Sequence, residues 1–167
     1  MVVAAGVSSE LVGPMMSTDG ASAPRIMLLI ISIGGQSFAL LGSHVERLLR
    51  MVAITPFPEG GPGVAGVVDF HGTLLPVVDP RVRLGLPAVA PHSDQRLVVL
   101  SVPARYILWV DTVTQVENLP AQVVNAEGRV GEALTNGMAN VGGELIPVLS
   151  SHALYPGALI ASAVRDS

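Results

Sequence analysis

The sequence of 167 residues contains no cysteine. Disulfide bonds, a thiolate nucleophile and zinc sites with cysteine ligands are therefore excluded. A chain of this kind is compatible with a reducing cytoplasm, although the absence of cysteine does not by itself fix a compartment.

Charged residues are scarce as well, at 13% of the chain, and the net charge is −4. The nine basic residues are scattered, whereas phosphate binding needs a clustered basic face, so we expect no nucleic-acid partner. Uninterrupted apolar runs such as 26–31 are much shorter than the roughly 20 residues of a membrane-spanning helix. We therefore expect no insertion into a bilayer.

Two segments repeat one pattern at a spacing of 71 residues. The sequence GVVDFHGTLLPVVD at 66–79 aligns without a gap with GMANVGGELIPVLS at 137–150. Upstream, FALL at 38–41 matches YILW at 106–109 at an offset of 68. The order of elements is thus duplicated, which predicts two small β units that lean on each other, because about 70 residues is near the lower limit for an independent core.

Apolar periodicity and turn residues predict a mainly β fold with short helices. We expect a disordered tail over 1–24, a folded region over 25–155, and a tail or short helix over 156–167. The first β unit should come mainly from 26–86 and the second mainly from 95–149. The hairpins expected are 26–41, 66–78, 96–110 and 137–149, and the short helices expected are 43–51 and 112–119.

No motif predicts catalysis. The four histidines have no spacing that would place two on one metal. Asp69 and His71 share a strand face, as a general base and its orienting carboxylate would, but no nucleophile accompanies them. The GGPG segment at 60–63 lacks the Lys-Ser/Thr of a phosphate loop. We therefore expect no enzyme activity, no catalytic residue, no metal and no cofactor.

Collinear motifs along the chain resemble the CheW-like domain of chemotaxis coupling proteins. In the first half these are VERLLR at 45–50, ITPFP at 54–58, GVVDFHG at 66–72, LPVVD at 75–79 and RLGL at 83–86. In the second half they are QRLVVL at 95–100, LWVDTV at 108–113 and GELIPVL at 143–149. The resemblance covers about residues 25–155, more than a single motif match.

The resemblance implies two SH3-like, five-stranded β-barrels around a shared core, without enzymatic activity or cofactor. It also implies a cytoplasmic adaptor that bridges the tip of membrane chemoreceptors to the regulatory domain of a CheA-type histidine kinase. Carried over by position, the partner-binding candidates are Val45, Arg47, Leu48, Met51, Gly66, Val67, Asp69 and His71. For Val45, Leu48 and Val67, plain core packing is an equal alternative.

The chain departs from the family at three of these positions. Relatives usually carry Glu where this chain has Arg47, Asn at Asp69 and Arg at His71. Asp69 could therefore replace the usual partner and pair with Arg47, or the change could be drift in a solvated pair worth under about 1 kcal/mol. His71 in place of arginine makes a surface charge titratable, which predicts a partner affinity that changes between about pH 6 and 8.

Two other functions are compatible with the sequence. The adaptor could serve a chemosensory pathway other than flagellar motility, such as a pilus or developmental system. A small-molecule binding barrel is the third reading, and it would need a closed pocket of several hundred Å³.

Overall fold

The computed structural model describes residues 24–61, 63–120, 124–125 and 134–156. The tails expected at 1–24 and 156–167 lie outside these residues, apart from Pro24 and Pro156. The described chain is mainly β, as expected. Its strands are β1 (Arg25–Ile33), β2 (Gln36–Leu41), β3 (Val45–Arg50), β4 (Val64–Phe70), β5 (Thr73–Val78), β6 (Arg96–Leu100), β7 (Tyr106–Val110), β8 (Thr112–Pro120), β9 (Val124–Asn125), β10 (Thr135–Val141) and β11 (Glu144–Leu149). The helices are α1 (Pro80–Leu84) and α2 (Ser151–Leu154), with 3-10 turns at Gly42–His44 and Pro58–Gly60.

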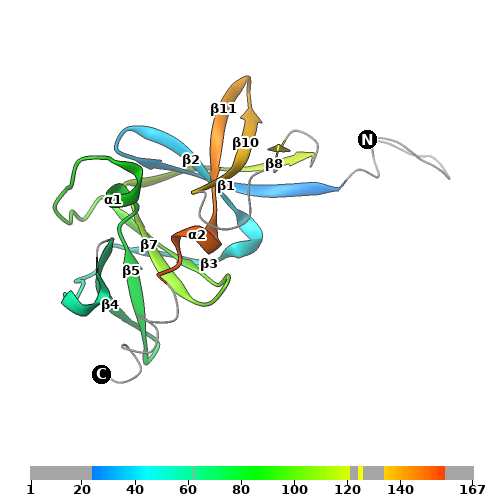
Figure 1. Cartoon of the computed structure of the whole chain (residues 1–167). Coiled ribbons are helices and arrows are strands. Elements are labelled where there is room, and N and C mark those ends of the chain that lie inside the picture. Colours follow the sequence, from blue (N-terminus) through cyan, green and yellow to red (C-terminus); the bar gives the residue numbers. More distant parts are fainter. Residues whose placement is uncertain (1–23, 62, 121–123, 126–133, 157–167) are drawn as a thin grey trace, which may run out of the picture.

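The strands form two sheets. One has six strands in the order β8-β1-β2-β11-β10-β9, and the other has five in the order β3-β6-β7-β5-β4 (Figure 1). An antiparallel bridge between Thr55 and Val67 joins the chain that follows β3 to β4, which are the two ends of the five-stranded order. Thr55 and Val67 exchange backbone hydrogen bonds of 3.0 and 2.8 Å, so this sheet closes on itself.

Each sheet takes strands from both repeats. The hairpin β1–β2 belongs to the first repeat but lies in the six-stranded sheet, while β6–β7 belongs to the second repeat and lies in the five-stranded sheet. The parallel contact of Val77 with Ile107 corresponds to that of Val148 with Ala39, at the offsets seen in the sequence. The sheets thus differ from the division into 26–86 and 95–149, because the repeats exchange their first hairpins.

The hairpins β4–β5 and β10–β11 share their local geometry. Each has a register shift at its glycine, next to Gly66 in β4 and Gly137 in β10. Pro76 lies opposite Val67, and Pro147 lies opposite Met138. Figure 1 shows the two hairpins at opposite ends of the molecule. The aligned segments at 66–79 and 137–150 therefore form the same supersecondary unit twice.

The helices expected at 43–51 and 112–119 are wrong, because these segments form strands β3 and β8. Val45 and Leu49 are four residues apart, a spacing that fits one face of a helix and one face of a strand equally well over six residues. In β8, the β-branched side chains of Thr112, Val113, Thr114 and Val116 favour an extended backbone. Directly before β3, Gly42–His44 makes a single 3-10 turn.

Three large clusters make up most of the core of the described residues. One cluster fills the five-stranded sheet and includes Val68, Leu97 and Trp109, and another lies in the six-stranded sheet and includes Leu28 and Ile146. The largest lies between the sheets and is supplied mostly by the exchanged hairpins. Its buried members are Leu29, Ile31, Ile33, Phe38, Leu40, Val78, Val98, Leu100, Tyr106, Leu108, Val110, Leu149 and Leu154. Alternate residues of β1 and β6 serve different clusters, so both faces of these strands are buried.

Candidate functional site

The eight partner-binding candidates all lie on or beside the two end strands of the five-stranded sheet. Val45, Arg47 and Leu48 are on β3, and Met51 follows its last residue. Gly66, Val67 and Asp69 are on β4, and His71 is in the turn to β5. The closure of this sheet through Thr55 and Val67 brings the two groups to the same side of the molecule.

Burial separates the candidates into two sets. Gly66 and Val67 are buried, and Val45 and Met51 are half-buried against core clusters, so these four have packing roles. The surface set is Arg47, Leu48, Asp69 and His71, all exposed. Leu48 is 45% exposed, so its side chain is available for contact.

The turn between β4 and β5 fixes the position of His71. Asp69 Oδ1 accepts a hydrogen bond of 2.7 Å from the backbone N–H of Gly72. His71 has a φ of 54°, a left-handed conformation that non-glycine residues rarely adopt. In the second repeat, Asn140 Oδ1 accepts the equivalent bond from Gly143 at 3.0 Å. Asp69 and its equivalent Asn140 therefore each cap the turn of their own hairpin.

Arg47 contacts His71 and does not pair with Asp69. Its Nη1 lies 3.4 Å from His71 Nε2, and its guanidinium carbon lies 5.9 Å from the centroid of the Phe70 ring. Among the ion pairs of the described residues there is none between Arg47 and Asp69. The hypothesis of a reversed Arg47–Asp69 pair is thus wrong within this structure, because the Asp69 carboxylate is turned toward its own hairpin.

A second arginine shares the same aromatic ring. Arg105 lies just before β7, and its guanidinium carbon is 5.8 Å from the Phe70 centroid. It donates to both carboxylate oxygens of Glu46, at 3.0 and 2.9 Å. Sequence reasoning missed this pair, because it placed residue 46 on a helix and 105 in the other barrel. We call Glu46, Arg47, Phe70, His71 and Arg105 the Phe70 cluster.

The described residues offer little for catalysis or metal binding. No group of three or more histidine, aspartate or glutamate side chains gathers where it could hold a metal ion in that part of the chain. The Asp69 carboxylate caps a backbone N–H instead of orienting the His71 ring. None of the helices within the described ranges is long and apolar enough to cross a membrane.

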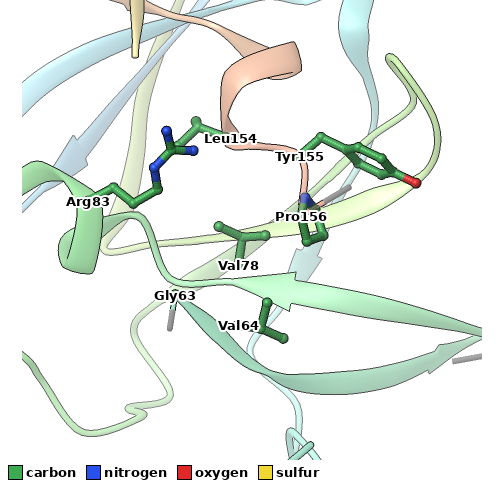
Figure 2. A pocket seen from close by; sticks show the side chains of 7 residues that line it. All are labelled: Gly63, Val64, Val78, Arg83, Leu154, Tyr155 and Pro156. Carbon is green, nitrogen blue, oxygen red and sulfur yellow. The ribbon is translucent and has the colours of Figure 1, made fainter. Parts of the chain in front are cut away.

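One pocket lies beside the five-stranded sheet, between α1 and the segment that follows α2 (Figure 2). Its volume is about 170 Å³, and its lining residues are Gly63, Val64, Val78, Arg83, Leu154, Tyr155 and Pro156. Arg83 extends from α1, and its guanidinium donates a hydrogen bond to the carbonyl oxygen of Ala153. This bond connects α1 to the segment at the C-terminal end of the described chain. The pocket is smaller than the roughly 300–1,000 Å³ of typical ligand sites.

Comparison with known sequences assigns the family. The profile of the CheW-like domain matches residues 27–158, most of the chain. This chain belongs to the CheW-like domain family. The chemotaxis protein CheW of Rhizobium meliloti (strain 1021) is 24% identical over 134 residues, which cover 77% of this chain and 86% of that protein. The chemotaxis protein CheW of Bacillus subtilis (strain 168) is 23% identical over 83 residues, covering 50% and 53%.

A solved structure supports the fold independently. The scaffolding protein TtCheW from Thermoanaerobacter tengcongensis superposes with a TM-score of 0.71 at 21% identity, covering 79% of this chain and 93% of that one. The expected CheW-like, mainly β fold is confirmed by this likeness. The CheW-like family consists of non-enzymatic scaffold and adaptor proteins, which agrees with the expectation of no enzyme.

Proposed function

We propose that this chain is a chemotaxis-type adaptor that couples chemoreceptors to a CheA-type histidine kinase. Membership of the CheW-like family over residues 27–158 carries this proposal. The duplicated architecture supports it, because two sheets around a shared core present two separate outer surfaces to two partners. The adaptor would act in the cytoplasm, held at receptor arrays through its partners.

Exposed apolar side chains on and just after β3 indicate where the kinase would bind. Leu48 projects from this strand with 45% of its surface exposed. Val52, which follows β3, is 46% exposed, so two apolar side chains lie on one short stretch of the chain. Exposed apolar residues near an edge strand favour protein contact. We therefore assign the regulatory domain of the kinase to the surface around Leu48 and Val52.

The test is a binding measurement with the full-length chain. Wild type should bind both a CheA-type kinase and a chemoreceptor tip from the same cell, as judged by co-purification and calorimetry. Leu48→Asp should weaken kinase binding by about tenfold, since a carboxylate would then be desolvated at the contact. Leu145→Asp is the matched control, because Leu145 is 62% exposed in the six-stranded sheet. Absence of both partners from the wild-type complex would overturn the proposal.

A further inference from the structure

The strands β3 and β8 hold equivalent places in the two sheets but differ in charge. β3 pairs with β6 at one end of the five-stranded order, and β8 pairs with β1 at one end of the six-stranded order. Three of the six residues of β3 are charged, namely Glu46, Arg47 and Arg50. Among the nine residues of β8, Glu117 is the one charged residue. Charge on an end strand discourages pairing with a further strand, so β8 is much less protected than β3.

The outer edge of β8 is open as far as the structure describes the chain. β1 pairs with one edge of β8, and no described strand pairs with the other. Thr114, Gln115 and Val116 are exposed, Val116 at 59%. A register shift next to Thr114 interrupts the pairing with β1 near the start of β8, but 115–120 pair with it without a break. Alternate backbone N–H and C=O groups of this segment are therefore available to a further strand.

The charge pattern of β8 fits a second copy of the same strand in one register. Two identical antiparallel strands are related by a two-fold axis, so one residue lies opposite its own copy. An axis at Glu117 would oppose two carboxylates, and an axis at Gln115 or Asn118 would place Glu117 opposite an apolar side chain. An axis at Val116 places Glu117 opposite Gln115, whose amide already donates to Glu117 within one chain. Val116 is also the middle residue of β8, so this register overlaps the two strands over their whole length.

We propose that two copies of this chain associate through β8, antiparallel, with Val116 at the two-fold axis. The exposed part of Val116 is then covered by the same side chain of the other copy, and each Glu117 faces a Gln115 amide across the contact. Such an isologous contact closes as a dimer. The Leu48 surface lies on β3 of the other sheet, so one dimer presents this surface twice. The association does not depend on the proposed adaptor function.

The first test is the oligomeric state of the full-length chain, measured by sedimentation equilibrium over a range of concentrations. Wild type should dimerise as the concentration rises. Val116→Lys would oppose two ammonium groups at the axis and should raise the dissociation constant of the dimer at least about tenfold. Val82→Lys is the matched control, because Val82 is 53% exposed on α1 and gains the same charge. Its dissociation constant should stay within about twofold of wild type. A wild type that stays monomeric, or equal constants for the two variants, would overturn the proposal.

The second test uses the absence of cysteine from the chain to check the register. Residues directly opposite in antiparallel strands have Cα atoms about 4.5–5.5 Å apart, within the range of a disulfide. Val116→Cys should therefore give a disulfide-linked dimer on mild oxidation. Asn118→Cys is the control, since this exposed position would lie four residues, or about 14 Å, from its own copy. Asn118→Cys that crosslinks as fast as Val116→Cys, or Val116→Cys that does not crosslink, would overturn the proposed pairing.

Discussion

The two repeated hairpins end in the same way. Asp79 follows β5 and caps α1, where its Oδ1 accepts from the backbone N–H of Arg81 at 3.1 Å. Ser150 follows β11 and caps α2, where its Oγ accepts from the N–H of Ala153 at 3.1 Å. The caps are 71 residues apart, as the sequence repeat requires. The duplication therefore extends through the first turn of each helix.

The first unit is stabilised by buried charge just beyond this cap. Arg81 is 1% exposed, and its guanidinium pairs with Asp79 at 3.0 Å and with Asp111. The same guanidinium lies 5.0 Å from the centroid of the Trp109 indole. Asp111 Oδ2 also accepts from the backbone N–H of Gly34 at 2.7 Å. These bonds connect α1, the end of β7 and the turn of the β1–β2 hairpin, and hence both sheets.

The second unit has neutral groups beside its cap instead. Ser151 is also 1% exposed, and its hydroxyl lies 3.0 Å from His44 Nδ1. Its carbonyl oxygen accepts a 2.6 Å bond from the hydroxyl of Tyr106. Burial raises the pKa of the Tyr106 phenol, which keeps this donor protonated. Backbone geometry was thus retained after duplication while the stabilising chemistry diverged, so the two units should respond differently to substitution and to pH.

The largest effect should come from the charged unit. Arg81→Met removes the cation and leaves Asp79 and Asp111 facing each other without compensation. We expect the free energy of unfolding to fall by about 3–5 kcal/mol, because breaking a buried ion pair from one side leaves an unbalanced charge. Urea unfolding measures the change. Arg50→Met on the exposed side of β3 is the control, with an expected change within about 0.5 kcal/mol; equal effects for the two variants would refute the charged network.

A smaller effect should separate Gly66, within β4 of the first hairpin, from Gly143, in the turn between β10 and β11 of the second. A Cβ at Gly66 would lie 2.1 Å from the backbone oxygen of Thr55, the atom that closes the five-stranded sheet. Gly66→Ala should therefore cost about 2–3 kcal/mol through forced backbone movement. At Gly143 nothing lies within 4 Å and φ is 88°, so Gly143→Ala should cost about 1 kcal/mol from backbone strain alone. Thermal unfolding of both variants gives the comparison, and the reverse order would contradict this account of closure.

The sequence predicted the parts of the fold that depend on local pattern. The hairpins around Gly34, His71 and Gly142 form as expected, because glycine pairs and alternating apolar residues specify short turns. The exchange of hairpins between repeats was not predictable in this way. It is decided by the parallel contacts of β5 with β7 and of β11 with β2, which join strands distant in sequence and carry no local signal.

The sequence predicted which residues belong to the candidate site better than it predicted the contacts between them. Residues 47, 69 and 71 were singled out from their departure from the family pattern, and Arg47 and His71 do lie together. Arg105 could not be found, because its proximity to Phe70 depends on the exchanged β6–β7 hairpin. Asp69 was assigned the wrong bond, since a carboxylate two residues before a left-handed turn favours its own backbone. In the second repeat, Asn140 and Gly143 make the equivalent bond.

The smallest effect should be a pH dependence of the unfolding free energy that arises from His44, beside Ser151 in the second unit. Burial lowers the pKa of His44, and the neighbouring His152, whose ring centroid is 6.2 Å away, lowers it further. The unfolded chain therefore binds a proton at residue 44 more readily than the folded chain does. The contribution of neutral His44 to stability should be complete above about pH 6.5 and should diminish as the pH falls below that value.

Unfolding free energies measured from pH 8 to pH 5 should decline more in wild type than in His44→Gln, which keeps an acceptor for Ser151. The His152→Gln variant should lie between the two, because it removes only the charge repulsion. Parallel curves for wild type and His44→Gln would assign the whole pH dependence to other groups and would remove the predicted contrast between the units.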